Sequence, residues 1–322
     1  MSIREKIVKL IKNKRQITAT EIAEYLDISR QALYRHLPEM LAEKQITKIG
    51  RPPKVFYILD NQKVKISNHQ LDNEAKKIIN NNYYIITPSG EKKEGLDGFI
   101  YWCEKQDLPI EKTAEEYLAT LKKYSNFKES GLIDGMQKMK GTFKKLYLDK
   151  VYYLDFYSIE RFGKTKLGQI LLYAKQSQNR KLMKELIDDI KPTVEQLIKK
   201  LKIEGVGFVP PTVKREVQFM NELRKKSNLL LREIKITKIK TEIVVPQKTL
   251  NKLPDRVENA QRTFVIEDSG FFDSILLIDD AVGSGATLNE IAKKIKEKGV
   301  AKKVIGLAIT GSFKGFDVIS EV

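Results

Sequence analysis

The chain has 322 residues, the length of about two ordinary domains. Its 59 Lys and Arg residues against 42 Asp and Glu give a net charge of +17, and its 41% hydrophobic content excludes a disordered or collagen-like chain. A single cysteine, Cys103, excludes a disulfide-built scaffold and a multi-cysteine zinc ribbon. The charge predicts a polyanionic partner, which could be nucleic acid, an anionic membrane surface or a phosphorylated small molecule.

The sequence predicts no membrane attachment. No cationic start followed by an apolar stretch indicates a signal peptide, and aliphatic runs such as Ile275–Ile278 are far shorter than the ~18 residues that span a bilayer. Since the chain also has only one cysteine, we expect it to be cytoplasmic.

The first 60 residues predict three helices followed by a hairpin. Apolar residues at helical spacing indicate an amphipathic helix over 3–11. Thr18 or Thr20 can cap a short second helix, and Ser29 can cap a third helix that runs to about Lys44. Two strands, expected over 46–49 and 55–58, enclose a basic turn at 50–54.

This order resembles the winged helix-turn-helix family, because TATEIAEYLDISRQALYRHLPEMLAEKQITKI supplies the short second helix, the turn and a long recognition helix. The resemblance implies DNA binding, since guanidinium groups pair with guanine edges and Gln with adenine in the major groove. Winged helices also serve as protein-protein modules; the 12 basic against 7 acidic residues over 1–60 favour nucleic acid. The predicted DNA contacts are Arg30, Gln31, Tyr34 and Arg35 in the recognition helix and Lys48, Arg51 and Lys54 in the wing.

Residues 61–149 predict a helical connector without evident chemistry. Helical segments are expected around Ala114–Tyr124 and Gly131–Leu148. Trp102 and Cys103 are expected in a core, because no close His points to a nucleophilic cysteine.

The most informative segment lies near the carboxyl end. A strand over 274–278 ends in two acids, a small-residue loop follows, and a helix over 288–298 leads to another strand over 304–309. A loop that opens a helix in a parallel sheet presents backbone N–H groups and the positive helix end to an anion. The glycines let the backbone approach, and the hydroxyls add donors. The predicted phosphate site is therefore Ala281, Val282, Gly283, Ser284, Gly285, Ala286 and Thr287.

The adjacent acids Asp279 and Asp280 need partners, because paired carboxylates at a strand end are costly to bury. Hydroxyl groups, a magnesium ion or a cationic group could supply them. A phosphate site beside a diol-and-metal site describes a phosphorylated pentose. The patterns GxxxxGK[ST] and GxGxxG do not occur, which argues against a P-loop and against a dinucleotide site.

ILLIDDAVGSGATL resembles the PRPP-binding motif of type I phosphoribosyltransferases. VPQKTLNKLPDRVENAQRTFVI, GVGFVPPTVKRE and LLYAKQSQNRKLMKELI extend the resemblance to the ComF branch of that family, over about residues 150–322. The chain departs from that branch in two ways. It has a winged helix instead of a zinc ribbon, and its loop has Gly283-Ser284 where that family often has Thr-Thr.

The resemblance implies a site and a cofactor. Ala281–Thr287 would bind the 5-phosphate of PRPP, and Asp279 and Asp280 would hold its ribose hydroxyls near Mg²⁺. Lys214 and Arg215 would neighbour the pyrophosphate. For Arg256 and Asn259, substrate contact and a purely structural role stay equally open.

The expected fold class is α/β, with a winged helix-turn-helix over 1–60, a helical connector over 61–149 and a phosphoribosyltransferase domain with a Rossmann-like parallel sheet over 150–322. Three functions follow. The first is a DNA-binding transcription regulator, expected to be a homodimer, that senses PRPP or a nucleotide. The second is an active magnesium-dependent transferase whose acceptor is a base, an amine or a nucleic acid. The third, of lower weight, is an anti-phage effector of the retron type, partnered by a reverse transcriptase.

Overall fold

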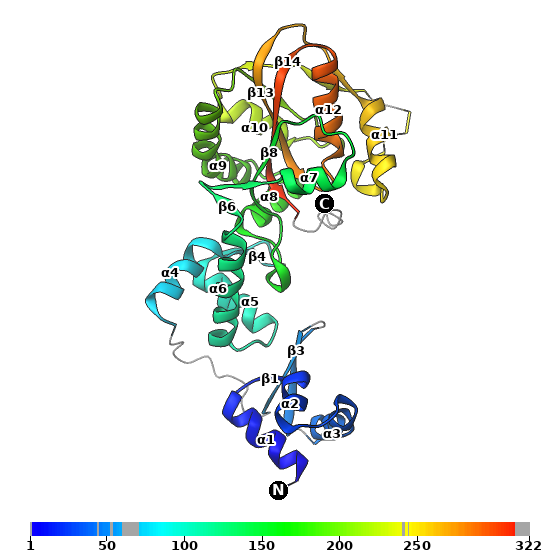
Figure 1. Cartoon of the computed structure of the whole chain (residues 1–322). Coiled ribbons are helices and arrows are strands. Elements are labelled where there is room, and N and C mark those ends of the chain that lie inside the picture. The colour runs from blue at the N-terminus through cyan, green and yellow to red at the C-terminus, as the bar shows by residue number, and fades with distance from the viewer. Residues whose placement is uncertain are drawn as a thin grey trace. The chain divides into compact units, whose positions relative to one another are not determined.

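The computed structural model describes residues 2–43, 45–51, 54–59, 71–239, 242–243 and 245–312, with the backbone alone for 49–51, 54 and 248. The chain forms two compact units, and the boundary between them falls between Ala119 and Thr120. Across the helices of the described residues, none is long and apolar enough to cross a membrane. Figure 1 shows the order of the elements.

The first unit begins with the three helices and the hairpin that the sequence predicts. Thr18 caps the second helix: its hydroxyl accepts from the Glu21 amide at 3.2 Å, and the Glu21 carboxylate accepts from the Thr18 amide at 2.8 Å. Ser29 caps the third helix by accepting from the Ala32 amide at 3.1 Å. The elements are α1 Ile3–Lys14, β1 Ile17–Thr18, α2 Ala19–Leu26, α3 Arg30–Ala42, β2 Ile46–Arg51 and β3 Lys54–Leu59.

Strand β1 is an addition to the predicted pattern. It pairs antiparallel with β3 through Ile17 and Tyr57, so the hairpin becomes a three-stranded sheet in the order β1-β3-β2. A two-residue strand carries no period-2 signal, which is why the sequence pattern could not show it. The pairing ties the turn between α1 and α2 to the hairpin.

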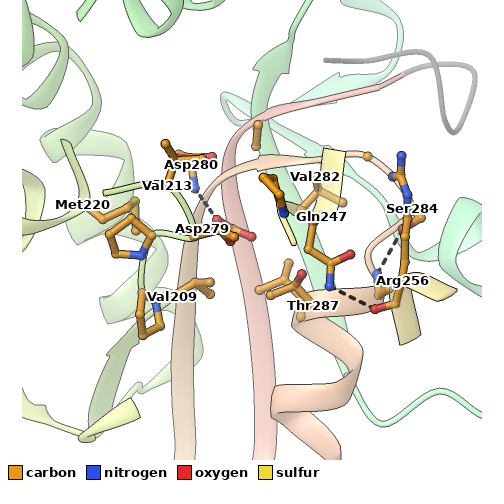
Figure 2. Close-up of a pocket in the computed structure, with 18 of the residues that line it drawn as sticks. Val209, Val213, Met220, Gln247, Arg256, Asp279, Asp280, Val282, Ser284 and Thr287 are labelled. Carbon is orange, nitrogen blue, oxygen red and sulfur yellow. Dashed lines mark hydrogen bonds between the residues drawn. The ribbon is translucent and has the colours of Figure 1, made fainter. Parts of the chain in front are cut away.

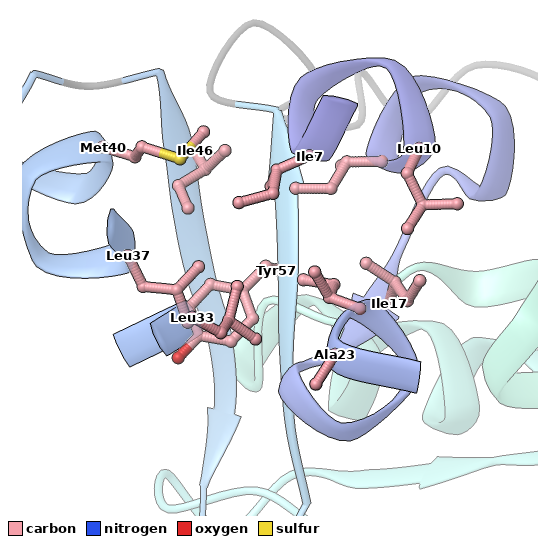
Figure 3. Close-up of a cluster of buried hydrophobic side chains, with 11 residues drawn as sticks. Ile7, Leu10, Ile17, Ala23, Leu33, Leu37, Met40, Ile46 and Tyr57 are labelled. Atoms are coloured by element: carbon pink, nitrogen blue, oxygen red, sulfur yellow. The ribbon is translucent and has the colours of Figure 1, made fainter. Parts of the chain in front are cut away.

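One hydrophobic core holds these helices against the sheet (Figure 3). Leu33, Leu37 and Met40 form the buried stripe of α3, and truncating such a leucine to alanine costs about 2–5 kcal/mol. The same spacing leaves the other face of α3 toward solvent. The buried cluster consists of Ile7, Leu10, Ile11, Ile17, Ile22, Ala23, Leu33, Leu37, Met40, Ile46 and Tyr57.

The rest of the first unit is mainly helical, with one small hairpin. Aromatic rings form its core: Tyr83 lies 5.2 Å from Phe99 and 5.4 Å from Tyr117, centroid to centroid. Cys103 is buried beside them, as predicted, and Trp102 is half-buried. The elements are α4 Asn73–Asn82, β4 Tyr84–Ile86, β5 Lys92–Glu94, α5 Gly95–Lys105 and α6 Ile110–Ser125.

The second unit is built on a seven-stranded sheet in the order β10-β9-β13-β14-β8-β7-β6. Its first five strands are parallel, and β7 and β6 add an antiparallel edge. The strands are β6 Lys128–Glu129, β7 Leu132–Asp134, β8 Lys150–Phe156, β9 Gly205–Phe208, β10 Arg232–Glu233, β13 Phe272–Val282 and β14 Ala301–Gly311, with β11 Ile236–Lys238 and β12 Phe264–Ile266 forming a separate pair.

Helices cover both faces of this sheet, with α9 and α10 on one side and α11 and α12 on the other (Figure 1). Its central strands β13 and β14 are apolar on both faces, as expected for a sheet covered twice. The helices are α7 Met136–Thr142, α8 Lys166–Gln176, α9 Arg180–Leu201, α10 Phe219–Ser227, α11 Leu253–Thr263 and α12 Ala286–Glu297, with 3₁₀ turns at Glu160–Phe162 and Gln247–Thr249.

The predicted fold class is therefore confirmed: a winged helix-turn-helix, mainly helical elements after it, and an α/β domain with a parallel sheet. The expectation of helix throughout Gly131–Leu148 is wrong at both ends, because Leu132–Asp134 forms β7, which pairs with β8, and α7 ends at Thr142. A three-residue apolar run cannot by itself distinguish the two structures. The boundaries at 60 and 150 stay predictions, and β6 and β7 belong to the sheet although they precede residue 150.

Candidate functional site

A tight loop, Gly283–Gly285, joins the carboxyl end of β13 to the first turn of α12 (Figure 2). Gly285 has φ +82°, a left-handed conformation that favours glycine, and a Cβ atom there would collide with Sδ of Met139 and lie 2.6 Å from its Cε. Ser284 is buried, and its hydroxyl accepts from the Ala286 amide at 3.3 Å. The loop thus brings backbone to the amino end of a twelve-residue helix, where the helix dipole favours an anion.

The acidic pair, Asp279 and Asp280, lies just before this loop, near the carboxyl end of β13. The Asp280 amide donates to Oδ1 of Asp279 at 2.8 Å, and Lys175 of α8 donates from Nζ to Oδ2 of Asp280 at 2.7 Å. The Lys175 and Asp280 side chains are only 14% and 20% exposed. Lys238 of β11 also attracts Asp279. Two lysines from distant elements therefore face the two acids.

Burial is the largest influence on the pKa values of Asp279 and Lys238. Burial, with the Asp280 charge next in importance, raises the pKa of Asp279 to about 8, against the opposing effect of Lys175 and Lys238. Burial lowers the pKa of Lys238 to about 8, while Asp279 acts to raise it. The Lys238 ammonium donates to Oγ1 of Thr212 at 3.0 Å. The acids and their lysines are thus partly removed from solvent.

A cavity of about 290 Å³ connects the acidic pair with the loop. Asp279, Asp280 and every residue of Ala281–Thr287 line it, so the structure brings together the whole predicted acid-and-phosphate segment. Its other walls are Lys175, the segment Val209–Val213, Arg215, Gln218, Gln247, Asn251 and Arg256. The two residues predicted to neighbour pyrophosphate differ in position. Arg215 lines the cavity, whereas Lys214 is exposed and lies outside the cavity lining.

The sequence left two roles open for Arg256 and Asn259, substrate contact or structural support. The structure gives the two residues different surroundings. The Arg256 Nε donates to the Leu250 carbonyl at 2.6 Å, and its Nη1 lies 3.4 Å from the position a Gly283 Cβ would take. Asn259 accepts from Nε2 of Gln247 at 3.2 Å and donates to the Val245 carbonyl at 3.4 Å. Arg256 therefore reaches the loop from a wall of the cavity, whereas Asn259 fastens the chain segment before α11.

Three residues of the site had no sequence signal of their own. They are Lys175 of α8, Lys238 of β11 and Met139 of α7, which precede Asp279 by 104, 41 and 140 residues. None of them stands out from its neighbours in the sequence. Only the packing of α8, β11 and α7 around the end of β13 places them there. Of the three, Lys175 lies within a segment that carries the resemblance, LLYAKQSQNRKLMKELI, and this was the nearest sequence signal for its place in the site.

The predicted DNA-contacting residues whose side chains the structure describes are all exposed. Arg30, Gln31, Tyr34 and Arg35 of α3 are exposed, with Tyr34 53% exposed although it is aromatic, and Lys48 of β2 is exposed as well. The side chains of Arg51 and Lys54 lie outside the described residues. The four predicted contacts on α3 fall within its first two turns, where a recognition helix contacts base edges.

Magnesium at Asp279 and Asp280 was expected from the resemblance, and the donor set can be tested against it. Mg²⁺ prefers several oxygen ligands in octahedral geometry. The pair supplies two carboxylates, one of which is already held by Lys175. Within the described part of the chain, no group of three or more His, Cys, Asp or Glu could hold a metal ion. These residues do not fit a metal ion held by the protein alone.

Comparison with known proteins identifies the amino-terminal region. A family model described as an HTH domain matches residues 3–46, which therefore form a helix-turn-helix domain, a type that indicates DNA binding. A search of the curated proteins found no match. Among solved structures, the chain is similar to a hypoxanthine phosphoribosyltransferase from Staphylococcus aureus, with 16% identity and a TM-score of 0.23. That match covers 38% of this chain and 62% of the enzyme, so the chain spans less than two thirds of its length.

Proposed function

We propose that the protein is a DNA-binding regulator or effector whose carboxy-terminal cavity binds PRPP or a nucleotide. The amino-terminal helix-turn-helix supplies the DNA-binding part. The cavity belongs to a domain that we assign to the type I phosphoribosyltransferases, ComF-like branch, on the motif ILLIDDAVGSGATL and the segments related to it.

One observation carries the proposal: the acidic pair and the small-residue loop line the same cavity, at the carboxyl edge of the sheet. Ligands of open α/β sheets bind at that edge. A volume of about 290 Å³ is just below the ~300–1,000 Å³ common for small-molecule sites, and it suits a small ligand such as a phosphorylated sugar.

Each group has a role in this proposal. The backbone amides and hydroxyls of Ala281–Thr287 hold the 5-phosphate, helped by the positive end of α12. Asp279 and Asp280 accept hydrogen bonds from the ribose hydroxyls. Arg215, on the segment after β9, pairs with a second anionic group of the ligand. Binding takes no step through magnesium.

Calorimetry of the full chain with PRPP tests this assignment. We expect the double variant Asp279→Asn, Asp280→Asn to lose at least about tenfold in affinity, because a hydrogen bond to a charged acceptor such as the Asp280 carboxylate contributes about 1.5–3 kcal/mol. Asp273→Asn is the matched control: it is on the same strand, but 64% exposed and paired with Lys302. If the double variant binds PRPP as well as this control does, the assignment of the acidic pair is wrong.

An active transferase is a second candidate, and a specific feature favours it. The segment Val209–Val213, where the resemblance places pyrophosphate, lines the same cavity as the phosphate loop. In that reaction an acceptor atom bonds to the anomeric carbon of PRPP as the bond to pyrophosphate breaks, with no protein nucleophile. Protein incubated with PRPP, Mg²⁺ and candidate acceptors releases pyrophosphate if this candidate is correct. A pure sensor binds PRPP and releases none.

Two further proposals concern partners. We expect a homodimer, since regulators that bind paired half-sites are usually two-fold symmetric, and light scattering of the purified chain measures its mass in solution. The anti-phage role with a reverse transcriptase keeps its lower weight. Copurification of such an enzyme with the tagged chain from its own host tests it.

A further inference from the structure

The acidic pair already has a cation, and it comes from the protein. Lys175, on the last turns of α8, places its ammonium 2.7 Å from Oδ2 of Asp280. Both side chains are largely buried in the wall of the cavity. A buried ion pair of this length is unlike the exposed lysine pairs elsewhere on the domain, such as Lys166 with Asp189, where both side chains are about 40% exposed.

The position of this ammonium has a chemical consequence for the carboxylates. A carboxylate has two oxygens and about four lone-pair sites, so one bound ammonium leaves room for other donors. A second cation bound to Asp280 beside this ammonium is disfavoured, because like charges repel strongly where water is scarce. Neutral hydroxyl donors carry no such penalty. The second ammonium, that of Lys238, acts on Asp279 in the same sense.

We propose that Lys175 is the resident cation of this pocket, which keeps divalent metal off the acidic pair and reserves its remaining oxygens for the hydroxyls of a ribose. The part about ribose rests on the proposed function, whereas the exclusion of metal does not. Lys175 is in this sense a specificity-determining residue: it selects neutral diols over divalent cations at Asp280.

Mn²⁺ alone, without any sugar phosphate, is the probe that tests the exclusion, with electron paramagnetic resonance measuring the free ion. We expect the wild-type chain to bind Mn²⁺ weakly, and Lys175→Met to bind it at least about tenfold more tightly, because the repelling charge is gone. Lys175→Gln is the second neutral variant, and Lys175→Arg, which keeps the charge, is expected to resemble wild type. Lys166→Met is the matched control on the same helix, with an exposed partner.

The outcomes separate clearly. A gain in both neutral variants, lost again when Asp280→Asn is added, supports the proposal. Wild type binding Mn²⁺ as tightly as the neutral variants overturns it, as does a gain that survives Asp280→Asn or folded neutral variants that gain nothing. Thermal unfolding monitored by circular dichroism establishes that each variant is folded.

Failure of the proposed function gives a different result. Ribose 5-phosphate and PRPP are titrated into the wild-type chain in the presence of EDTA, with calorimetric detection. Absence of binding to either compound, with and without Mg²⁺, counts against the proposed function, while the Mn²⁺ experiment still decides the role of Lys175. Binding of ribose 5-phosphate in EDTA supports a diol site that needs no metal.

Discussion

The winged helix and the α/β domain use charge in opposite ways. On α3, Arg30 and Arg35 are exposed. In the cavity, Asp279 and Asp280 are partly buried and are faced by lysines from other elements. The net charge of +17 belongs to the whole chain, and residues 1–60, for which we propose DNA binding, hold 12 basic against 7 acidic residues. That charge gives no information about the cavity, where we propose that backbone amides hold an anion beside two acids.

The two regions also differ in how their functional groups are gathered. The predicted DNA contacts of α3 come from one stretch of six residues, Arg30–Arg35, so a single helix presents them together. The cavity takes residues from α8, from the segment after β9, from the stretch around Gln247–Arg256 and from the end of β13. We expect single substitutions to weaken the first region by additive steps, and to disturb the second as a unit.

The largest effect is expected at the loop. Gly285→Ala should destabilise the domain by roughly 2–4 kcal/mol, since it adds left-handed strain and a collision with Met139, and it should weaken PRPP binding about tenfold or more. Gly299→Ala has similar strain, at φ +72°, but nothing within 4 Å of the added atom, so it should cost only about 1–2 kcal/mol. Urea unfolding and calorimetry measure both. Equal losses in the two variants would show that packing by Met139 is unimportant.

The DNA-binding face should respond more gradually. Arg35→Ala is expected to cost about 1–3 kcal/mol of binding to a preferred sequence and to relax its specificity, because an arginine that contacts a base edge carries sequence information. Lys12→Ala removes the same charge from the exposed face of α1 and should change affinity little. Electrophoretic or fluorescence titration with selected DNA at several salt concentrations measures the difference. A loss of equal size in both variants would reduce the interface to general electrostatics.

Two residues of α11, Arg256 and Asn259, test the difference between ligand contact and structural support within the α/β domain. Arg256→Ala should lower PRPP affinity about tenfold, because its guanidinium lies beside Gly283. It should also cost about 1 kcal/mol of stability, because the hydrogen bond to the Leu250 carbonyl is lost. Asn259→Ala should lower stability by about 1 kcal/mol and leave affinity unchanged, since its hydrogen bonds go to Gln247 and Val245. Each variant controls for the other. The opposite pattern would make Asn259 a ligand contact.

The smallest effect concerns Lys138 of α7, whose ammonium donates to the Ser312 carbonyl at 2.9 Å. Burial lowers its pKa from 10.5 to about 8, so between these values the folded chain binds fewer protons than the unfolded chain. The free energy of unfolding must then rise with pH across that window, by less than about 1.4 kcal/mol per pH unit, since solvent partly screens the group. Lys138→Met should remove this contribution, with exposed Lys140→Met as the control. Urea unfolding at pH 8, 9 and 10 measures the slope, and identical slopes in wild type and Lys138→Met would contradict the assignment.

Several elements could be predicted from the sequence because their signals are local. Thr18 with Glu21 forms a capping box, and Ser29 caps α3, so both helix starts follow from short-range chemistry. The apolar run before Asp279 and the small residues after it define a strand, a turn and a helix. β7 and β1 could not be found in this way, because strands of two or three residues exist only through their partners.

The sequence by itself thus determined the order of the domains, the recognition helix and the acid-and-glycine segment, since the interactions that form each of them lie within a few residues. Only the tertiary structure decided what surrounds that segment. It put Lys175 against Asp280 and Met139 against Gly285, and it separated Arg215 from Lys214 and Arg256 from Asn259. The physical reason is that burial and partner charges depend on packing between elements far apart in the chain, which no local pattern encodes.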